Sequence, residues 1–369
     1  MRLGQNGAVI ELDEMLADLE LLVNTESPSL HADLLQRSAE VVADLLHRRL
    51  GGTAQLIDGP AGPHVLWQGG GTPRVLIVGH HDTVFPVGSV AKRPFAVTDG
   101  RATGPGVFDM KGGIVQFVHG LASLPDRSGV EILITSDEEV GSGTSRELIE
   151  RRAIACGNVL VCEPSGDGGA LKIARKGTGT FEVVVHGKAS HAGLEPEKGV
   201  NSLIAAAELV GKVIHFADPS KGTTVTPTVA TAGTADNVVP AQARVVFDVR
   251  IEELEEGPRV EADFASLDTS VPGARVEVLG GLNRPPMPLA ASERIFPTAV
   301  AAAAAAGLAP LRGVAVGGAS DGNFTAACGV PTLDGLGAVG GGAHADHEYI
   351  EVATLVPRAQ LIAAIVAAL

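Results

Sequence analysis

Aromatic residues are scarce in this sequence, at 3% of 369 residues with one Trp and one Tyr, so we expect a core built mainly from Ala, Val and Leu. Basic residues are in deficit as well. The sequence has 28 Lys and Arg against 43 Asp and Glu, which gives a net charge of −15. Nucleic acids and anionic membranes are recognised through basic surface, so we expect neither as a partner.

Cysteine is rare, and long apolar runs are absent. Cys156, Cys162 and Cys328 have no metal-knuckle spacing and cannot all pair, which favours reduced thiols in the cytoplasm. No apolar run reaches membrane-spanning length, and residues 1–22 lack the basic flank, apolar stretch and cleavage site of a signal peptide. We therefore expect a cytoplasmic globular protein, and its length indicates two domains.

Short apolar segments that resemble buried strands run into acids or histidines. They are residues 75–78 before His80 and Asp82, residues 130–135 before Asp137-Glu138-Glu139, and residues 158–162 before Glu163. Asp109 lies in a glycine-rich stretch that precedes a predicted helix starting near Gly113. Strands that repeatedly end in metal-binding residue types indicate one site at the edge of a sheet.

Helical stretches separate most of these strands, which is typical of an α/β fold with a mainly parallel, helix-covered sheet. From about residue 177 the order becomes β-α-β-β-α-β, as in the α+β ferredoxin-like sandwich. We expect a discontinuous catalytic domain, residues 1–176 and 283–369, with the ferredoxin-like domain, residues 177–282, inserted. Glycine-rich loops are expected at 317–323 and 340–348.

Together, His80, Asp109, Glu139, Glu163 and His344 would supply two imidazole nitrogens and three carboxylates. This donor set suits two Zn²⁺ ions, each held by one histidine and one carboxylate, with the third carboxylate shared. Co²⁺ and Mn²⁺ are alternatives. Two such ions can activate water for attack on an amide carbonyl.

Two neighbours of these residues have predicted supporting roles. Glu138 is the natural general base and acid, because on an extended segment it points away from Glu139 and can face the water. Asp82 shares a strand face with His80, and a carboxylate often orients a metal-binding histidine. His81 points to the other face and is expected to pack in the interior.

Other interpretations of single motifs stay open at this point. Asp109 alone could be a helix cap, and the acidic run 137–139 could be a solvated helix start. His347 is a weaker rival to His344 as a metal ligand. The combination of motifs favours the metal site over these separate interpretations.

The chain resembles the di-zinc metallopeptidase family of bacterial glutamate carboxypeptidase, acetylornithine deacetylase, succinyl-diaminopimelate desuccinylase and aminoacylase, and is most similar to glutamate carboxypeptidase. The matching motifs follow the family's order over almost the whole chain. They are Gly79-His80-His81-Asp82-Thr83-Val84, Gly104-Pro105-Gly106-Val107-Phe108-Asp109-Met110-Lys111-Gly112-Gly113, Asp137-Glu138-Glu139-Val140-Gly141-Ser142, Glu163-Pro164, Gly187-Lys188-Ala189-Ser190-His191-Ala192-Gly193, and His344 before Glu348-Tyr349-Ile350.

The resemblance implies a role for each matched residue. His80 and Glu163 would bind one metal, Glu139 and His344 the other, and Asp109 would bridge them; Asp82 would orient His80, and Glu138 would be the general base. The inserted domain would be a lid and dimerisation domain, whose His191 would stabilise the oxyanion in the partner subunit. Substrate contacts would come from Asn237, Arg250, Arg284 and the 317–322 loop with Gly318.

The implied activity is release of a C-terminal amino acid from a small peptide or N-acyl amino acid by a homodimeric enzyme. Met110 follows Asp109 where glutamate carboxypeptidases carry a second Asp, which leaves the substrate open. An N-acyl-amino-acid deacylase fits the same residues. A single-metal deacetylase and a non-catalytic binding module are more remote alternatives, and for Arg250 a strand salt bridge competes with substrate contact.

Overall fold

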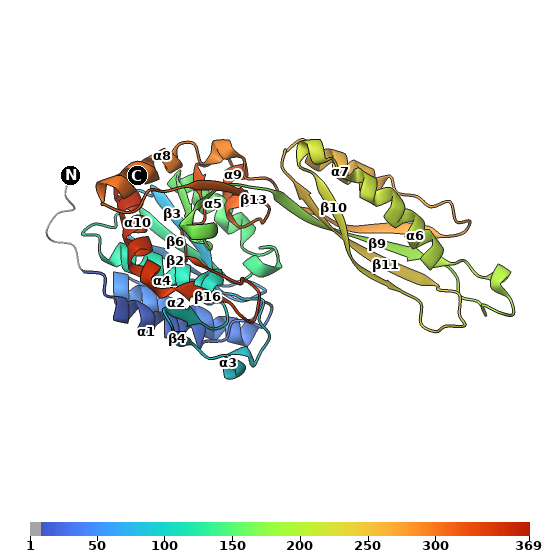
Figure 1. Ribbon diagram of the computed structural model, residues 1–369, viewed down its shortest axis with the longest axis horizontal. Coiled ribbons are helices and arrows are strands. Elements are labelled where there is room, and N and C mark those ends of the chain that lie inside the picture. Colours follow the sequence, from blue (N-terminus) through green and yellow to red (C-terminus); the bar gives the residue numbers. More distant parts are fainter. Residues whose placement is uncertain (1–8) are drawn as a thin grey trace. The chain divides into compact units, whose positions relative to one another are not determined.

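The computed structural model describes residues 9–369, so the first eight residues, which begin the segment expected to contain no signal peptide, lie outside it. The chain forms two compact units (Figure 1). Unit 1 contains the chain up to Ala174 together with Met287–Val316 and Ser320–Leu369, and unit 2 contains Arg175–Pro286 and Gly317–Ala319. Among the described residues, no helix is both long and apolar enough to cross a membrane.

A six-stranded sheet forms the centre of unit 1, in the order β1-β2-β6-β3-β7-β14. Strands β6, β3, β7 and β14 are mutually parallel, while β1 and β2 are antiparallel additions at one edge. The strand bounds are β1 Gln55–Ile57, β2 His64–Gln68, β3 Val75–His80, β6 Val130–Thr135, β7 Val159–Val161 and β14 Thr332–Leu333. The carboxyl ends of the parallel strands therefore meet at one edge.

Alternate residues of the buried strands face two different cores. On β3, Val75 and Ile77 pack into one cluster with α1, α2, α4, α8 and α10, while Leu76 and Val78 pack into another with α5 and α9. This is the period-two alternation of a sheet that is covered on both faces. The helix bounds are α1 Leu12–Val23, α2 Ala32–Leu50, α4 Gly112–Ala122, α5 Arg146–Cys156, α8 Ile295–Ala305, α9 Gly322–Ala327 and α10 Leu355–Ala368.

Unit 1 also contains short strands and a short helix outside the six-stranded sheet. A small sheet has the order β15-β16-β5-β4, and a two-stranded sheet pairs β13 with β8. Their bounds are α3 Ser89–Lys92, β4 Ala96–Thr98, β5 Arg101–Thr103, β8 Leu171–Arg175, β13 Gly313–Val316, β15 Gly340–Gly341 and β16 Tyr349–Glu351. Gly113 lets α4 approach the sheet closely, since a Cβ there would lie 2.1 Å from the Cys162 carbonyl oxygen.

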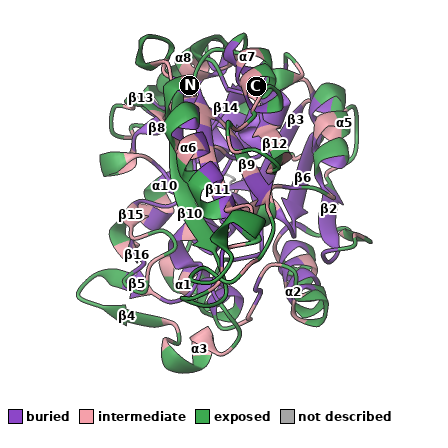
Figure 2. Ribbon diagram, turned by 90° about the vertical axis from the view of Figure 1, so that its right-hand side faces the viewer, coloured by how far each residue is buried: buried purple, intermediate pink, exposed green. Residues whose placement is uncertain are grey.

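Unit 2 is an antiparallel sheet in the order β10-β11-β9-β12, and helices α6 and α7 pack on it around an apolar core. Stacked Phe181 and Phe264, whose ring centroids lie 3.9 Å apart, join β9 to α7. Strand β10 lies at an edge of the sheet and is exposed along almost its whole length (Figure 2). The bounds are β9 Gly177–His186, α6 Ser202–Val213, β10 Thr224–Ala232, β11 Gln242–Ile251, α7 Glu256–Ala265 and β12 Arg275–Arg284.

The predicted α/β architecture, with a mainly parallel sheet and an inserted β-α-β-β-α-β segment, is confirmed. The loop predicted over residues 317–323 is wrong at its end, because α9 begins at Gly322. The small sheet β15-β16-β5-β4 was not predicted, since strands of two or three residues leave no periodic pattern. The assignment of a lid and dimerisation role to the inserted segment stays a prediction.

A buried carboxylate joins three helices of unit 1. Asp18 on α1 accepts hydrogen bonds from Arg49 Nε on α2 at 2.7 Å, from Arg48 Nη1 at 3.2 Å and from His119 Nε2 on α4 at 2.8 Å. Burial raises the pKa of Asp18, but the hydrogen bonds from His119 and Arg49 outweigh it and bring the pKa to about 2. The ionised Asp18 therefore ties α1, α2 and α4 together.

We expect Asp18→Ala to lower the free energy of unfolding by about 3 kcal/mol at pH 7, because it leaves buried His119 and half-buried Arg49 without their counter-charge. Exposed Asp44, which also pairs with Arg48, is the matched control, and Asp44→Ala should cost about 0.5 kcal/mol or less. Because the folded-state pKa of Asp18 lies below its ordinary 3.8, its contribution is complete above that value and is lost as pH falls towards 2. Urea unfolding at several pH values checks this, and equal losses for both variants would contradict it.

Candidate metal centre

His80 closes strand β3 at the carboxyl edge of the sheet and is 1% exposed. Its Nδ1 lies 3.0 Å from the backbone oxygen of Asp82 and 3.5 Å from Asp82 Oδ1. The Nε2 atom is thereby directed to the other side, towards Asp109 Oδ1 at 3.3 Å and Glu163 Oε1 at 3.4 Å. The predicted proximity of Asp82 to His80 is present, with the backbone oxygen as the nearer partner.

Asp82 also holds the acidic turn that follows β6. Its two carboxylate oxygens accept the backbone N–H groups of Glu138 and Glu139 at 3.2 and 3.3 Å, and its Oδ2 accepts the Ser29 hydroxyl at 2.7 Å. The predicted extended conformation at Glu138 and Glu139 is wrong, because Glu138–Val140 forms a 3₁₀ turn. Three residues per turn still direct the two side chains about 120° apart.

Asp109 lies between two histidines from opposite ends of the chain. Its Oδ1 is 3.3 Å from His80 Nε2, and its Oδ2 is 3.3 Å from His344 Nε2. Glu139 Oε2 is 3.0 Å from the same His344 nitrogen. The structure thus brings together all five residues predicted as metal ligands, with Asp109 in the middle.

The electrostatics of the site favour positive charge. Burial alone would lower the pKa of His80, but hydrogen bonds with Asp109, Asp82 and Glu163 raise it well above its ordinary value. Hydrogen bonds with Asp109 and Glu139 raise the pKa of His344 to about 10. Burial raises the pKa of Glu139, whereas at Asp109 hydrogen bonds from the two histidines outweigh burial and lower the pKa. Both histidines therefore hold protons that compensate the surrounding carboxylates.

The donor atoms fit metal ions. Ligand atoms of His80, Asp109 and Glu139 lie within 4.8 Å of one another, as do those of His80, Glu138 and Glu163. Glu139 Oε1 is buried and has no hydrogen-bond partner among the described residues. A buried carboxylate oxygen without a donor is costly, and a cation would satisfy it. Imidazole nitrogens with carboxylate oxygens are the donors that Zn²⁺, Co²⁺ and Mn²⁺ accept.

Glu348 is a central residue of this site that sequence reasoning missed. It is fully buried, and its carboxylate accepts the backbone N–H groups of Gly106, Phe108 and Asp109 at 2.8 to 2.9 Å. Burial raises the pKa of Glu348 to about 7, against the lowering effect of these three bonds. The sequence signal for Glu348 is an acid directly before the short strand β16. It stands in the Glu348-Tyr349-Ile350 motif, which served only to identify His344.

The two histidines of the C-terminal loop differ clearly. His344 contacts Asp109 and Glu139 and adopts a left-handed backbone conformation with φ of 63°. Non-glycine residues rarely adopt this conformation outside constrained sites. His347 is exposed, and no ion pair of its ring occurs in the described part of the chain. His81 packs inside as predicted, with its ring nitrogens 3.0 Å from Ser38 Oγ and 3.1 Å from the Pro63 oxygen.

Unit 2 carries the remaining predicted residues. His191 lies in an exposed loop, where its Nδ1 accepts the backbone N–H groups of Gly193 and Leu194 at 3.1 Å each. Nδ1 therefore serves as an acceptor, which leaves Nε2 as the ring position that can donate a hydrogen bond. The strand-like bridge from His191 to Val238 places Asn237 beside this loop, and Asn237 O accepts the Ala192 N–H at 2.9 Å.

The predicted substrate-binding residues have other partners in unit 2. Arg250 forms a bidentate ion pair with Asp248 at 2.7 and 2.8 Å, which is the strand salt bridge left open as its alternative. Arg284 is buried at the end of β12, next to Asn283 Oδ1 at 3.3 Å. The carbonyl oxygen of Gly318 accepts a hydrogen bond from Arg175 at 3.0 Å, so the glycine loop is fastened to the start of unit 2.

A cluster of histidines and carboxylates at the carboxyl edge of a parallel sheet suits a metal-dependent enzyme. The model of peptidase family M20/M25/M40 matches residues 76–368, so the chain belongs to this family. It is a metallopeptidase of a family that hydrolyses peptide or amide bonds, as predicted.

Individual proteins support the same assignment. Carboxypeptidase G2 of Pseudomonas sp. (strain RS-16) is 34% identical over 310 residues, which cover 80% of this chain and 74% of that protein. Succinyl-diaminopimelate desuccinylase of Halorhodospira halophila is 32% identical over 333 residues, covering 80% and 83%. The fold is shared with an M20 family metallo-carboxypeptidase from Sulfolobus solfataricus, with a TM-score of 0.79, 16% identity, and coverage of 96% of this chain and 98% of that one.

We expect Glu348→Ala to weaken metal binding and lower kcat/KM by about 10- to 100-fold each, because three backbone N–H groups of the loop that carries Asp109 lose their acceptor. Glu348→Gln keeps the shape and should lie between the wild type and Glu348→Ala. Exposed Glu351, at the end of β16, is the control, and Glu351→Ala should change neither quantity. Metal titration with kinetics on the same samples measures both, and wild-type metal affinity in Glu348→Ala would refute the role.

Proposed function

We propose that the protein is a dinuclear metalloexopeptidase that releases a C-terminal amino acid from a small peptide or N-acyl amino acid, in the manner of a glutamate carboxypeptidase. The observation that carries this proposal is Asp109, whose two carboxylate oxygens each face a different histidine at 3.3 Å. A carboxylate in that position suits two cations better than one. The likeness to carboxypeptidase G2 supports the substrate class.

In this proposal His80 and Glu163 would hold one metal ion, and Glu139 and His344 would hold the other, with Asp109 shared. We propose zinc, and Co²⁺ or Mn²⁺ could occupy the same donors. The chemistry that the bound ions would supply is a lowered pKa of water and polarisation of the scissile carbonyl. Asp82 would keep His80 in one orientation and tautomer through the contacts at Nδ1.

Glu138 would act as general base and general acid. Its backbone is fixed by Asp82, and its carboxylate lies within 4.8 Å of ligand atoms of His80 and Glu163. From there it would take a proton from the attacking water and deliver it to the nitrogen of the leaving amino acid. The adjacent Glu139, directed to Asp109 and His344, would stay a metal ligand throughout.

Residues of unit 2 would bind the substrate. His191 presents an Nε2–H donor that is set in advance by two backbone bonds to Nδ1, which suits stabilisation of an oxyanion. Asn237 lies on the adjoining segment. Arg250, Arg284 and the Gly318 loop would complete the contacts with the substrate, with the arginines as partners for its carboxylate.

An N-acyl-amino-acid deacylase is the second candidate, and the likeness to succinyl-diaminopimelate desuccinylase favours it. Both activities break an amide bond next to an amino acid, and they share every proposed metal ligand and the general base. They differ in the group on the acyl side of the bond. Identification of the products therefore separates them.

We also propose a cytoplasmic homodimer formed through unit 2. Strand β10 is an exposed edge strand, and Leu203 and Ile204 of α6 are 50% and 60% exposed. Two β10 strands pairing across a two-fold axis would continue the sheet from one subunit into the next. His191 would then act in the active site of the partner.

The dimer proposal predicts that the wild type sediments at twice the mass of one chain and that Val229→Lys on β10 shifts it towards the monomer. Leu279→Lys, on the opposite edge strand β12, is the matched control, since both positions are nearly half exposed. Sedimentation velocity measures both. A monomeric wild type, or equal effects of the two variants, would rule out this interface.

The catalytic proposal predicts that the zinc-loaded wild type releases free amino acid from dipeptides or N-acyl amino acids, and that Glu138→Gln lowers kcat roughly 10²- to 10⁴-fold. Metal content, measured on the same samples, should be unchanged, because Glu138 is not a proposed ligand. Glu147→Gln, an exposed acid on α5, serves as the control. Full activity in Glu138→Gln would disprove the assigned base.

A further inference from the structure

The loop that carries His344 is held at both of its ends. Strand β15 pairs with β16 before it, and at its other end the Glu348 carboxylate accepts three backbone N–H groups near Asp109. Residues 343–347 lie between these anchors and form neither helix nor strand. His344 itself has a left-handed backbone conformation with φ of 63°. This conformation is unfavourable for a residue with a side chain, so the middle of the loop needs support from its surroundings.

Arg93 supplies such support from outside the metal centre. Its Nη1 donates to the backbone oxygen of Asp346 at 2.9 Å, and its Nη2 lies 3.2 Å from Asp346 Oδ1. Among residues 9–369, the other ion pairs that tie residues 343–347 to a distant segment are those of His344 within the metal centre. The side chain of Asp346 is 92% exposed, so its ion pair contributes little. The hydrogen bond to the backbone oxygen therefore provides most of the support.

The guanidinium of Arg93 is itself held in place by Phe85. Its central carbon lies 4.9 Å from the centroid of the Phe85 ring, and this ring is buried. A guanidinium is attracted to the face of an aromatic ring, and its planar fork remains able to donate hydrogen bonds. Phe85 follows Asp82 by three residues. Arg93 thus connects the segment that leaves β3 with the C-terminal loop.

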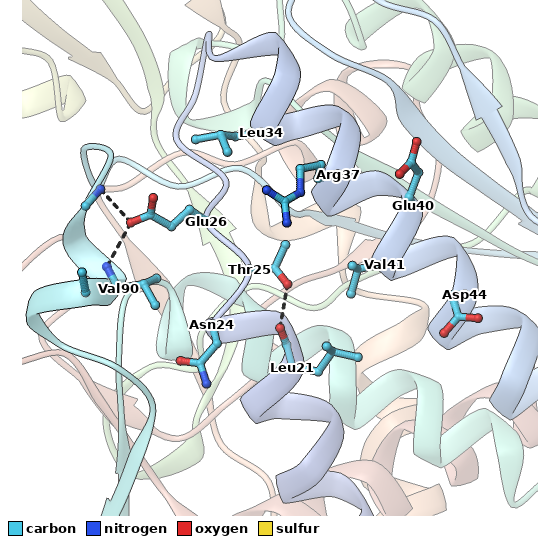
Figure 3. Close-up of a pocket in the computed structure, with 12 residues that line it drawn as sticks. Leu21, Asn24, Thr25, Glu26, Leu34, Arg37, Glu40, Val41, Asp44 and Val90 are labelled. Atoms are coloured by element: carbon cyan, nitrogen blue, oxygen red, sulfur yellow. Dashed lines mark hydrogen bonds between the residues drawn. The ribbon is translucent and has the colours of Figure 1, made fainter.

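The backbone around helix α3, which directly precedes the arginine, is fastened to the end of α1. Glu26 Oε1 accepts the N–H groups of Gly88 and Val90 at 2.7 and 3.1 Å (Figure 3). On the other side of the arginine, Asn24 Oδ1 accepts the N–H group of Phe95 at 3.0 Å. These bonds to backbone groups fix the position from which the arginine reaches the C-terminal loop.

We propose that Arg93 is a positioning residue for His344 and thereby sets the affinity of one of the two proposed metal ions. That ion is the one that Glu139 and His344 would hold, and the role of Arg93 rests on the proposed dinuclear centre. The other ion would be held by His80 and Glu163, which are placed by β3 and β7 and not by the C-terminal loop. A ligand that is ordered before the ion arrives loses less conformational entropy on binding, so the ion binds more tightly.

Chelator competition on the zinc-loaded protein tests this role, because it measures the affinity of each ion without relying on turnover. Arg93→Met keeps an apolar stem beside Phe85 but removes the donors. We expect it to weaken one ion about 10- to 100-fold, while the affinity of the other changes about twofold or less. Arg93→Lys keeps a charged donor and should lie between the wild type and Arg93→Met. The ion that remains bound shows that the variant is folded.

Two control variants separate the backbone contact from the charges around it. Asp346→Asn loses the ion pair but keeps the backbone oxygen, so it should change the affinity of either ion about twofold or less. Lys92→Met, at an exposed position of α3 next to Arg93, should do the same. A loss in Lys92→Met as large as in Arg93→Met would overturn the proposal.

A double variant shows whether Arg93 acts through His344. His344→Ala alone should weaken the same ion, and adding Arg93→Met should then weaken it no more than about twofold further, because there is no ring left to position. A full additional loss in the double variant, or equal weakening of both ions in Arg93→Met, would overturn the role. Wild-type affinities in Arg93→Met would overturn this role alone, whereas a wild type that binds a single ion would overturn the dinuclear centre together with it.

Discussion

The carboxylates of Asp109, Glu138, Glu139 and Glu163 gather at the edge of one sheet, and the rest of unit 1 depends on this constraint. Like charges in a partly buried place repel and are poorly solvated, so such a cluster forms only with compensating positive charge. Without a cation, the histidines supply it as protons, which is why the pKa of His344 rises to about 10. Metal ions would take over that compensation and release those protons.

The loops that carry the acids are held by two further carboxylates through their backbones. Asp82 accepts the N–H groups at the start of the Glu138–Val140 turn, and Glu348 accepts three N–H groups of the loop around Asp109. Backbone N–H donors stabilise these anions without neutralising the cluster. The geometry of the site is therefore set by groups that need not touch a metal, and Asp82 links the ends of β3 and β6.

The pattern that recurs along the sequence, an apolar strand followed by a metal-binding residue type, could be predicted. His80 and Glu163 follow apolar strands, and parallel strands bring their carboxyl ends together, so local pattern sufficed for them. Glu348 was missed because its importance comes from N–H groups some 240 residues away in sequence, which no local pattern records. The turn at Glu138 was predicted as extended for the same reason, since Asp82 caps it from another strand.

The two candidate activities share the centre in unit 1, so the choice between them depends on groups that bind the ends of the substrate. Arg250 is already paired with Asp248 through two short bonds, and a substrate carboxylate would have to displace a bidentate partner to use it. His191 needs no such exchange, because its Nδ1 is occupied and its Nε2–H is free to donate. In the proposed function, such a preorganised donor would act on the reacting amide, which both activities have in common. In the proposed function, substrate preference would therefore come from exchangeable pairs such as Arg250 with Asp248, and not from the residues proposed to perform the hydrolysis.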